Sequence, residues 1–277
     1  MKFIVTGHRG WIGRHVCRLL DERGIKYQGF DRKINYDLNS PEGHREFEYA
    51  LTDADAVIHL AARPRIPASW ASPADYIKDN IELTEYIART CPMFGVPIVF
   101  ASSSSVYGNG DGPLNPYSWS KLAGEQILET YGRSLNLNYK ICRIFTCYGE
   151  DAPHGDKGLV LGNWLHAKLN NKPILIRGSG DQRRDFVHVT DVARALIIAA
   201  RSKAPSFTID LGTGENHSLN EIAEMFGCEI VREHELCGYA THTLADPIPA
   251  VKMLGWTANH NLPEWVATVC SSTKTDV

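Results

Sequence analysis

Short apolar runs alternate along this chain with longer segments of helical periodicity, and this alternation restricts the possible folds more than any other feature. Apolar runs bounded by turn residues predict buried strands, and the longer segments predict helices. Strands joined by crossover helices form a parallel sheet with helices on both faces. The expected strands are residues 2–7, 25–31 and 55–62, residues 96–105 running into a serine-rich turn, and residues 138–149 with the loop that follows the strand. The expected helices are residues 11–24, 80–91 and 118–136.

The pattern becomes less regular after Gly149, where short elements mix with loops that contain Gly and Pro. No internal repeat or low-complexity linker separates this part from the rest. We therefore expect an α/β fold, a doubly wound parallel sheet (Rossmann) with a smaller mixed C-terminal substrate lobe. The expected dinucleotide-binding domain takes residues 1–149 with 186–205, and the expected substrate-binding lobe takes 150–185 with 206–277.

Composition excludes several classes of protein. The chain has 29 Lys and Arg against 32 Asp and Glu, and this net charge of −3 argues against a nucleic-acid-binding surface. No apolar run reaches the roughly 18 residues that a membrane span needs, and the first residues lack the pattern of a signal peptide. The seven cysteines show no Cys-x-x-Cys spacing and predict reduced core residues, not a metal site. By elimination, we expect a cytoplasmic protein without a metal.

Three glycines, Gly7, Gly10 and Gly13, lie between the first expected strand and the first expected helix. In this context the first glycine permits a tight turn, the second allows backbone to approach a pyrophosphate, and the third allows close packing of helix on sheet. The free N–H groups of the helix N-terminus would then bind the phosphates. The alternative is a turn without a ligand, since the spacing Gly-x-x-Gly-x-x-Gly differs from the commoner Gly-x-Gly-x-x-Gly.

Asp31 stands at the end of the second expected strand. A carboxylate there can accept hydrogen bonds from both hydroxyls of the adenosine ribose and would repel a 2′-phosphate. Arg9 and Arg32 could instead bind a 2′-phosphate, although Arg32 could equally be a solvated turn residue. The sequence therefore favours NAD as the cofactor and leaves NADP possible.

The stretch PYSWSK places Tyr117 four residues before Lys121, so that the two side chains share one face of a helix. The same spacing occurs by chance in many helices, and the pair alone does not distinguish an acid–base pair from surface residues.

Taken together, these features resemble the extended short-chain dehydrogenase/reductase family, and within it the NAD-dependent nucleotide-sugar epimerases and dehydratases, with UDP-glucose 4-epimerase as the familiar member. The resemblance covers nearly the whole chain. The motifs that carry it occur in the family's order: VTGHRGWIG, DAVIHLAA, SSSSVYG, PYSWSK, RDFVHVTDVARA, IDLGTGENHSL and KMLGW.

This resemblance implies that Ser103, Tyr117 and Lys121 are the catalytic residues. Tyr117 would take a proton from a sugar hydroxyl while a hydride leaves the same carbon for the nicotinamide, Ser103 would orient the reacting oxygen, and Lys121 would hold the nicotinamide ribose. Free tyrosine has a pKa of about 10, so we expect the lysine and the nicotinamide ring to lower it.

The resemblance also implies two sets of binding residues. The cofactor set is Gly7, Arg9, Gly10, Trp11, Ile12, Gly13, Asp31, Arg32, Asp37, Leu38, Leu60, Ala61, Ala62, Tyr117, Lys121 and Tyr148. The substrate set is Ser103, Ser104, Tyr117, Thr146 and Arg184. Arg184 would bind the nucleotide pyrophosphate, with Arg183 as the alternative, whereas His188 and Asp191 would brace the loop. Thr146 stands where many relatives have Asn, so the usual contact of that amide is in doubt.

The residues next to Ser103 narrow the reaction. Dehydratases of the family carry Asp-Glu at the positions of Ser104 and Ser105, decarboxylases carry Glu at the latter, and GDP-fucose-forming epimerase-reductases carry Cys there. Oxidation at C4 with hydride return is what remains, and we expect an NAD-dependent nucleotide-sugar 4-epimerase. The alternatives are an NAD(P)H-dependent reductase of a keto-sugar nucleotide and a dinucleotide-binding sensor without catalysis. Many relatives dimerise through two helices, here about 80–94 and 118–136, so a homodimer is expected too.

Overall fold

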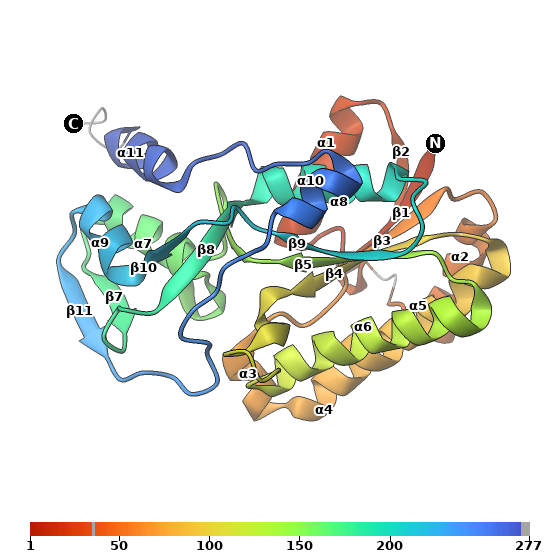
Figure 1. Ribbon diagram of the computed structural model, residues 1–277, viewed down its shortest axis with the longest axis horizontal. Coiled ribbons are helices and arrows are strands. Elements are labelled where there is room, and N and C mark those ends of the chain that lie inside the picture. Colours follow the sequence, from red (N-terminus) through yellow and green to blue (C-terminus); the bar gives the residue numbers. More distant parts are fainter. Residues whose placement is uncertain (35–36, 273–277) are drawn as a thin grey trace.

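A six-stranded parallel sheet forms the centre of the computed structural model, which describes residues 1–34 and 37–272 (Figure 1). Its order is β2-β1-β3-β4-β5-β9, and every pair in it is parallel. The strands are β1 (Lys2–Thr6), β2 (Lys26–Phe30), β3 (Ala56–His59), β4 (Ile98–Ser103), β5 (Tyr139–Ile144) and β9 (Phe207–Leu211). The doubly wound sheet predicted from the sequence is thus confirmed.

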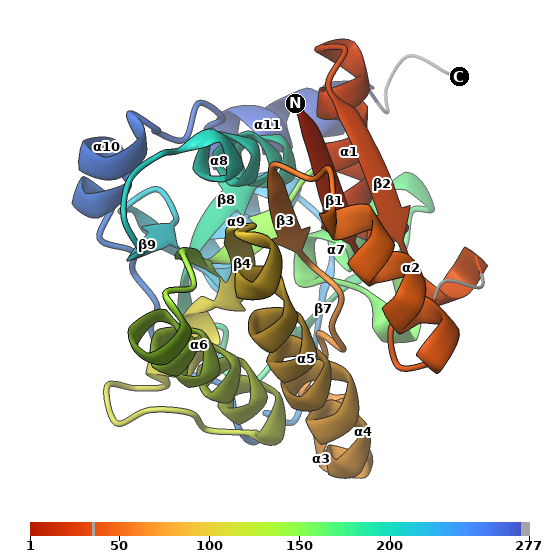
Figure 2. The ribbon, with the colours of Figure 1, turned by 90° about the vertical axis from the view of Figure 1, so that its right-hand side faces the viewer.

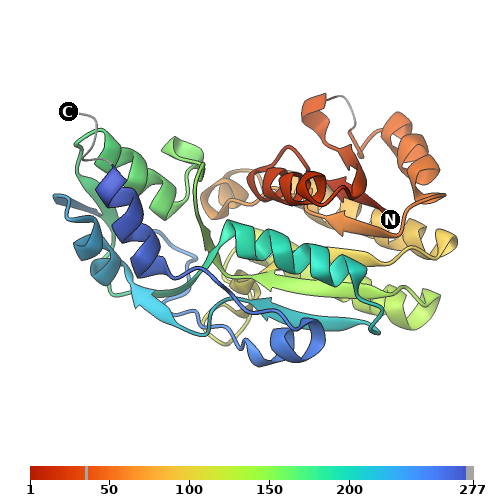
Figure 3. The same ribbon diagram turned by 90° about the horizontal axis from the view of Figure 1, so that it is seen from above.

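Helices cover both faces of this sheet, as Figure 2 and Figure 3 show. On one face lie α1 (Trp11–Glu22), α8 (Val189–Arg201) and α10 (Ile248–Leu254), and on the other lie α2 (Pro41–Leu51), α5 (Leu83–Thr90) and α6 (Pro116–Leu135). Successive residues of a strand point to opposite faces. Phe3 and Val5 accordingly pack under α1 and α8, whereas Ile4 packs under α2 and α5.

A smaller lobe is built from two further sheets beyond the carboxyl ends of the large sheet (Figure 1). One contains β6 (Thr146–Tyr148), β8 (Arg183–His188) and β10 (Asn216–Ser218), and the other contains β7 (Ile174–Arg177) and β11 (Ile230–Glu233). The lobe's helices are α7 (Val160–Leu169), α9 (Leu219–Phe226) and α11 (Leu262–Ser272). Trp164, Phe226 and Trp265 lie in its separate core.

The remaining helical segments are short: α3 (Ile66–Ala71), α4 (Pro73–Tyr76), a π-helical turn at Ile77–Glu82, and 3₁₀ turns at Arg32–Ile34, Cys91–Phe94, Ser104–Tyr107 and Gly155–Lys157. The helix expected at 80–91 therefore continues a helical run that starts at Pro73. The strand expected at 138–149 is divided between β5 and β6, which belong to different sheets.

One predicted boundary is wrong. The predicted substrate lobe includes residues 207–211, but these form β9, which pairs with β5 at the edge of the large sheet. The apolar side chains Ile209 and Leu211 are buried there, under α8 and α10. The predicted lobe also includes α10, which packs on the large sheet through Ala250. The rest of the division into a dinucleotide-binding domain and a substrate lobe stays a prediction.

The predicted dimer also stays a prediction, and the apolar side chains of α6, one of its two expected interface helices, differ in their exposure. Leu128 of α6 is fully buried against the sheet, so it has no surface to offer a second chain. Leu122 and Ile127 keep partial exposure. Within the described residues, no helix combines the length and apolar character needed to cross a membrane.

Candidate active site

The glycine turn has the geometry of a phosphate-binding loop. Gly7 has φ +70°, and its N–H donates to the Phe30 carbonyl at 2.7 Å. A Cβ on Gly7 would lie 2.7 Å from the Ala61 nitrogen, and a Cβ on Gly13 would lie 2.7 Å from Cα of His8. Side chains are therefore excluded at both positions, and α1 starts close against the strand ends.

The N-terminus of α1 is open to an anion. Gly10 is the N-cap and supplies no side-chain cap, and the first turn contains no acidic residue. The first N–H groups of a helix lack partners within the helix and carry partial positive charge. Trp11, Ile12 and Gly13 provide these groups, which fits the diphosphate of a dinucleotide.

Asp31 lies beside this turn at the end of β2. Its Oδ2 accepts from the backbone N–H of Arg9 at 3.0 Å, and its Oδ1 accepts from the N–H of Lys33 at 3.0 Å. Each carboxylate oxygen has capacity for a further hydrogen bond. The side chain is partly exposed, so it remains available for the two hydroxyls of a ribose.

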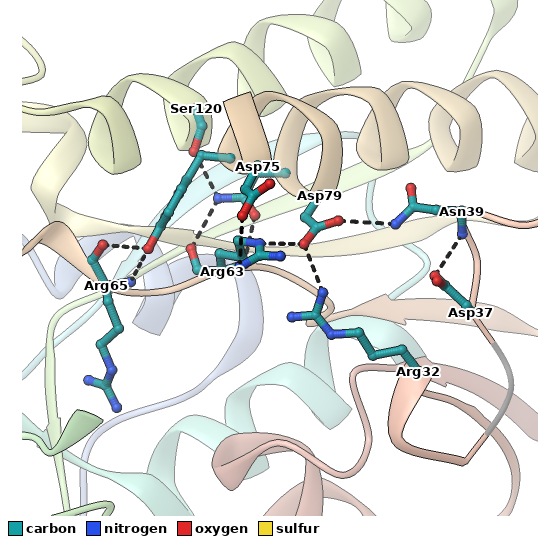
Figure 4. A network of polar contacts seen from close by, with 10 residues as sticks. Arg32, Asp37, Asn39, Arg63, Arg65, Asp75, Asp79 and Ser120 are labelled. Atoms are coloured by element: carbon teal, nitrogen blue, oxygen red, sulfur yellow. Dashed lines mark hydrogen bonds and ion pairs between the residues drawn. The ribbon is translucent and has the colours of Figure 1, made fainter. Parts of the chain in front are cut away.

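Arg32 is held by a cluster that the sequence did not reveal (Figure 4). Its Nη1 lies 2.9 Å from Oδ2 of Asp79, and the same oxygen accepts from Nε of Arg63 at 2.5 Å. Asn39 donates to the other oxygen at 3.1 Å, and Asp75 lies 3.3 Å from Arg63. The sequence left Arg32 as either a phosphate ligand or a solvated turn residue. The structure shows instead that Arg32 is ion-paired to a buried carboxylate.

The other predicted cofactor residues lie near this edge of the sheet, with one exception. Ala61 lies against Gly7, and Leu60 packs with Trp11 and Ile12 beside the same core. Ala62 follows them, and Asp37 and Leu38 precede α2, where Asp37 accepts from the N–H of Asn39. The exception is Tyr148.

The prediction that Tyr148 contacts the cofactor does not fit the structure. Its side chain has no exposed surface, and its ring packs edge-on against His188 and Trp265 inside the smaller lobe. A fully enclosed ring has no surface to offer a nicotinamide.

A proline and an asparagine position Tyr117 in the first turn of α6. Asn115 caps the helix by accepting from the N–H of Ser118 at 2.8 Å, and Pro116 occupies the first helical position. Such a start is favourable because proline has a helical φ and needs no N–H partner there. Ser103 ends β4 and lies close enough to the Tyr117 phenol to lower its pKa.

Ser103 is itself oriented by a neighbour. Its Oγ accepts from the hydroxyl of Ser105 at 2.9 Å and from the N–H of Ser105 at 3.2 Å. The proton of the Ser103 hydroxyl is thereby left free to point elsewhere. Ser104, predicted to contact substrate, is buried in the same 3₁₀ turn.

Lys121 lies one turn after Tyr117 and is buried. Its Nζ donates to the Ala101 carbonyl at 2.9 Å and lies 4.8 Å from the ring centroid of Phe100. Burial lowers the pKa of Lys121 to about 8, and Glu125 opposes that shift. This near-neutral pKa is typical of a functional lysine.

The expected lowering of the Tyr117 pKa is not produced by the protein alone. Burial raises the pKa of Tyr117, and the hydrogen bond with Ser103 and the charge of Arg65 oppose this rise. The ammonium of Lys121 is directed to the Ala101 carbonyl instead.

A buried histidine, His59, links the end of β1 to α5. Thr84 donates its hydroxyl proton to the Asn80 carbonyl at 2.6 Å, so it can only accept from Nε2 of His59 at 3.1 Å. Nδ1 of His59 must then accept from the Thr6 hydroxyl at 2.7 Å. Burial lowers the pKa of His59 to about 3, so this histidine stays neutral and has a structural role.

Asn80 supports the loop after β3, and sequence reasoning passed over it. Its side chain accepts from the N–H of Arg63 at 2.7 Å and donates to the Arg63 carbonyl and to Ser120. The only signal in the sequence is the number of residues between the Leu-Ala-Ala stretch and this asparagine, because no local pattern around Asn80 distinguishes it.

Glu125 organises the other side of α6. It accepts from the Ser102 hydroxyl at 2.5 Å and pairs with Arg143 at 2.6 Å. Arg143 also donates to Tyr107, whose hydroxyl donates to Asp210 at 2.8 Å. This chain of contacts ties α6 to β4, β5 and β9.

In the smaller lobe, Arg184 rather than Arg183 is available to a ligand. Arg183 pairs with Glu221 at 2.8 Å and binds Asn216. Arg184 donates only to the carbonyls of Arg183 and Ala240, at 2.8 and 2.5 Å, and has no carboxylate partner in the described part of the chain. Burial lowers the pKa of Arg184.

The segment around Ala240 brings Arg184 to the catalytic side. Asn115, the cap of α6, donates to the Gly238 carbonyl at 2.8 Å. Asn109 accepts from the N–H of Thr241 at 2.8 Å. Thr146 stands opposite Phe186 in the same sheet and is partly exposed, and Asp191 braces the loop at Asn259 and His260 as predicted.

Across residues 1–34 and 37–272, no three His, Cys, Asp or Glu side chains are grouped to hold a metal ion. The arrangement is instead that of a dinucleotide-dependent enzyme. A helix N-terminus open to phosphate and a carboxylate placed for ribose lie at the carboxyl edge of the sheet that also carries a Ser–Tyr–Lys set.

Comparison with known proteins agrees. The model of the NAD dependent epimerase/dehydratase family matches residues 3–212, and the chain belongs to that family. A UDP-glucuronate 4-epimerase of Thermodesulfobacterium geofontis is 30% identical, over 95% of this chain and 93% of its own length.

Two solved structures are similar over the whole of both chains. MoeE5 in complex with UDP-glucuronic acid and NAD is 30% identical, with a TM-score of 0.87. The UDP-glucose 4-epimerase of Thermus thermophilus, in complex with NAD, is 26% identical, also with a TM-score of 0.87.

Proposed function

We propose that this protein is an NAD-dependent nucleotide-sugar 4-epimerase, which oxidises C4 of the sugar and returns the hydride to the opposite face. The observation that carries the proposal is the arrangement of Ser103 at the end of β4, Tyr117 in the first turn of α6 and a buried Lys121 one turn later. Relatives and structural neighbours that are UDP-sugar 4-epimerases support it.

The residues present fit NAD. Gly7, Gly10 and the N–H groups of Trp11, Ile12 and Gly13 would hold its diphosphate, and Asp31 would hold the adenosine ribose. Arg9, exposed on the turn, would lie beside the phosphates. Lys121 would bind the nicotinamide ribose. When bound, NAD supplies the carbon that takes up a hydride and gives it back.

Tyr117 moves the proton. Its phenolate accepts the proton of the sugar C4 hydroxyl as the carbon–hydrogen bond at C4 breaks, and C4 becomes a carbonyl. Ser103 donates to the developing oxygen, because its own oxygen is already occupied by Ser105. After the keto-sugar rotates, Tyr117 returns the proton to the C4 oxygen.

Arg184 would hold the substrate's diphosphate during that rotation. Its guanidinium is half-buried and lacks a carboxylate, and a planar fork suits phosphate oxygens. Holding the nucleotide while leaving the sugar loose is what a rotation requires. Thr146, partly exposed on β6, would contact the sugar with its hydroxyl.

The residues beside Ser103 argue against elimination. Ser104 and Ser105 carry neither a carboxylate nor a thiol, and Ser105 is engaged in orienting Ser103. Loss of water or carbon dioxide would lack its acid or base there.

A direct test is epimerisation of UDP-hexoses in deuterated water without added reductant. We expect the C4 epimer to form with no deuterium at C4, because the hydride returns within the site, and the denatured protein to release NAD. Deuterium at C4 would indicate a route other than hydride return. In a parallel assay with a keto-sugar nucleotide and NADH, consumption of NADH in proportion to product would identify a reductase instead.

A further inference from the structure

Arg65 is a half-buried cation without a partner. Its guanidinium forms no hydrogen bond or ion pair with any residue in the ranges 1–34 and 37–272, whereas the nearby Arg63 is paired with Asp79 and Asp75. Burial lowers the pKa of Arg65, as it does for Arg184. A guanidinium removed from water without an anion is unfavourable, so a group of this kind points to an anionic ligand.

Tyr76 fixes where the Arg65 side chain starts. The Tyr76 hydroxyl donates to the Arg65 carbonyl at 2.6 Å and accepts from the Arg65 N–H at 3.3 Å. The Tyr76 ring lies edge-on to the ring of Tyr117, with centroids 6.4 Å apart. Arg65 is thereby anchored beside the catalytic tyrosine.

The two arginines of this loop point in opposite directions. Figure 4 shows Arg63 directed at Asp79, while the Arg65 side chain extends away from that cluster. The groups whose charges act on Arg65 are Tyr117, Tyr76 and Tyr239. No carboxylate is among them, and Tyr117 is, so the Arg65 guanidinium lies near Tyr117 without an anion to neutralise it.

We propose that Arg65 binds a carboxylate on the sugar, which makes the substrate class nucleotide-linked hexuronic acids; this rests on the proposed epimerase function. Tyr117 contacts the hydroxyl of C4, and the carboxylate of a hexuronic acid is attached to the adjacent C5. A cation beside Tyr117 is therefore within reach of that group. The fork of a guanidinium matches both oxygens of a carboxylate.

The diphosphate is the other anion that a nucleotide sugar carries. Arg184 is placed for it from the smaller lobe, and the groups whose charges act on Arg184 are Tyr239 and Glu235, not Tyr117. Of the two arginines, only Arg65 is thus close enough to Tyr117 for their charges to interact. This assigns the sugar to Arg65 and the diphosphate to Arg184.

Calorimetric titration of the NAD-loaded protein with UDP, UDP-glucose and UDP-glucuronate tests the assignment. Wild type should bind UDP-glucuronate more tightly than UDP-glucose. Arg65→Gln should weaken UDP-glucuronate by about tenfold or more and leave UDP and UDP-glucose within about twofold, because only the carboxylate loses its partner. Arg65→Lys keeps the positive charge but not the planar guanidinium fork, so its affinity for UDP-glucuronate should lie between those of wild type and Arg65→Gln.

Two further variants calibrate the result. Arg184→Gln should weaken all three ligands, and Arg201→Gln, an exposed arginine at the end of α8, should weaken none. An equal loss for all three ligands in Arg65→Gln would overturn the proposal by placing Arg65 at the diphosphate. Unchanged binding of UDP-glucuronate in a folded Arg65→Gln protein would overturn it as well.

These outcomes are separable from the proposed function. If the protein epimerises UDP-glucose and its binding of UDP-glucuronate does not depend on Arg65, the proposed 4-epimerase function stands and the proposed hexuronate specificity is wrong. If UDP-glucuronate binding depends on Arg65 but the protein epimerises none of the sugars, the proposed carboxylate site stands and the proposed 4-epimerase function is wrong.

Discussion

The guanidinium of Arg32 lies 2.9 Å from the carboxylate of Asp79, a residue from the π-helical turn before α5. Arg32 directly follows Asp31, which we expect to hold the adenosine ribose, and for that reason we expect it to lie nearest a 2′-phosphate. The carboxylate of Asp79, whose side chain is only 12% exposed, is also shared with Arg63 and Asn39. Asp79 thus holds Arg32 in an ion pair, and we expect this pairing to strengthen the preference for NAD.

Asp79→Asn should raise the affinity for NADP relative to NAD by about fivefold, because it releases Arg32 to pair with the 2′-phosphate. Such an exposed ion pair contributes about 1 kcal/mol to binding. Fluorescence titration with both dinucleotides measures the ratio. The double variant Asp79→Asn with Arg32→Gln should return to the wild-type ratio. A gain that persists in the double variant would mean that Arg32 is not its source.

Asp31→Ala should weaken NAD by roughly 10- to 100-fold and NADP much less, since two ribose hydroxyls lose a charged acceptor. Asp31→Asn, which keeps one acceptor oxygen, should lie in between. Both dissociation constants can be obtained by the same titration. Equal losses for the two cofactors would show that Asp31 only holds the Arg9 turn and does not touch the ribose.

Tyr117→Phe should lower turnover by about 10²- to 10⁴-fold, the usual contribution of a positioned acid–base group, and leave NAD binding nearly unchanged. The measurement is the steady-state rate beside the dissociation constant of NAD. Ser103→Ala should lower turnover less, because it removes a hydrogen bond and not the base. Loss of NAD binding in Tyr117→Phe would indicate a structural tyrosine.

Lys121→Met should be more stable than wild type at pH 7. The folded-state pKa of Lys121, about 8, lies below the ordinary lysine value of 10.5. The unfolded chain therefore binds more protons between pH 8 and 10.5, and wild type gains stability as the pH rises through that window.

The destabilising contribution of Lys121 is complete below pH 8, at up to about 3 kcal/mol, and vanishes above pH 10.5. Urea unfolding of both proteins at pH 7 and pH 10 gives the difference. A gap between the two proteins that does not narrow with rising pH would contradict the buried, depressed lysine. Lys121→Met should also lose turnover at every pH.

Glu125→Gln should lower the free energy of unfolding by about 3–5 kcal/mol, because it leaves the Arg143 guanidinium without its buried partner. Ser102→Ala removes one hydrogen bond to the same carboxylate and should cost about 1 kcal/mol. Denaturant titration compares the two. Similar losses in both variants would mean that the ion pair adds little beyond a neutral hydrogen bond.

The sequence alone was sufficient for the parallel sheet and the glycine turn, whereas the catalytic role of the Ser–Tyr–Lys set stays a prediction. These depend on local signals: apolar periodicity, glycines that no side chain can replace, and a four-residue helical spacing after Pro116. The family resemblance then supplied roles for residues that periodicity alone left open, such as Tyr117 and Lys121.

Other features depend on contacts between segments far apart in the chain. Sequence reasoning misplaces β9 because a short strand carries no signal of which sheet will accept it. It also places Tyr148 at the cofactor, whereas Tyr148 packs on Trp265, which follows it by more than a hundred residues. Asp79 captures Arg32 across 47 positions.

What the sequence determined, then, is which chemistry the chain carries, because catalytic residue types and turn glycines are set locally. The tertiary structure decided which charged side chains remain free to bind a ligand. The sequence does not distinguish Arg32, Arg63, Arg65 and Arg184, but folding pairs the first two with Asp79 and leaves the last two without an ion pair among the described residues. Whether a charge is neutralised depends on which distant groups are buried against it, and only the folded chain fixes that.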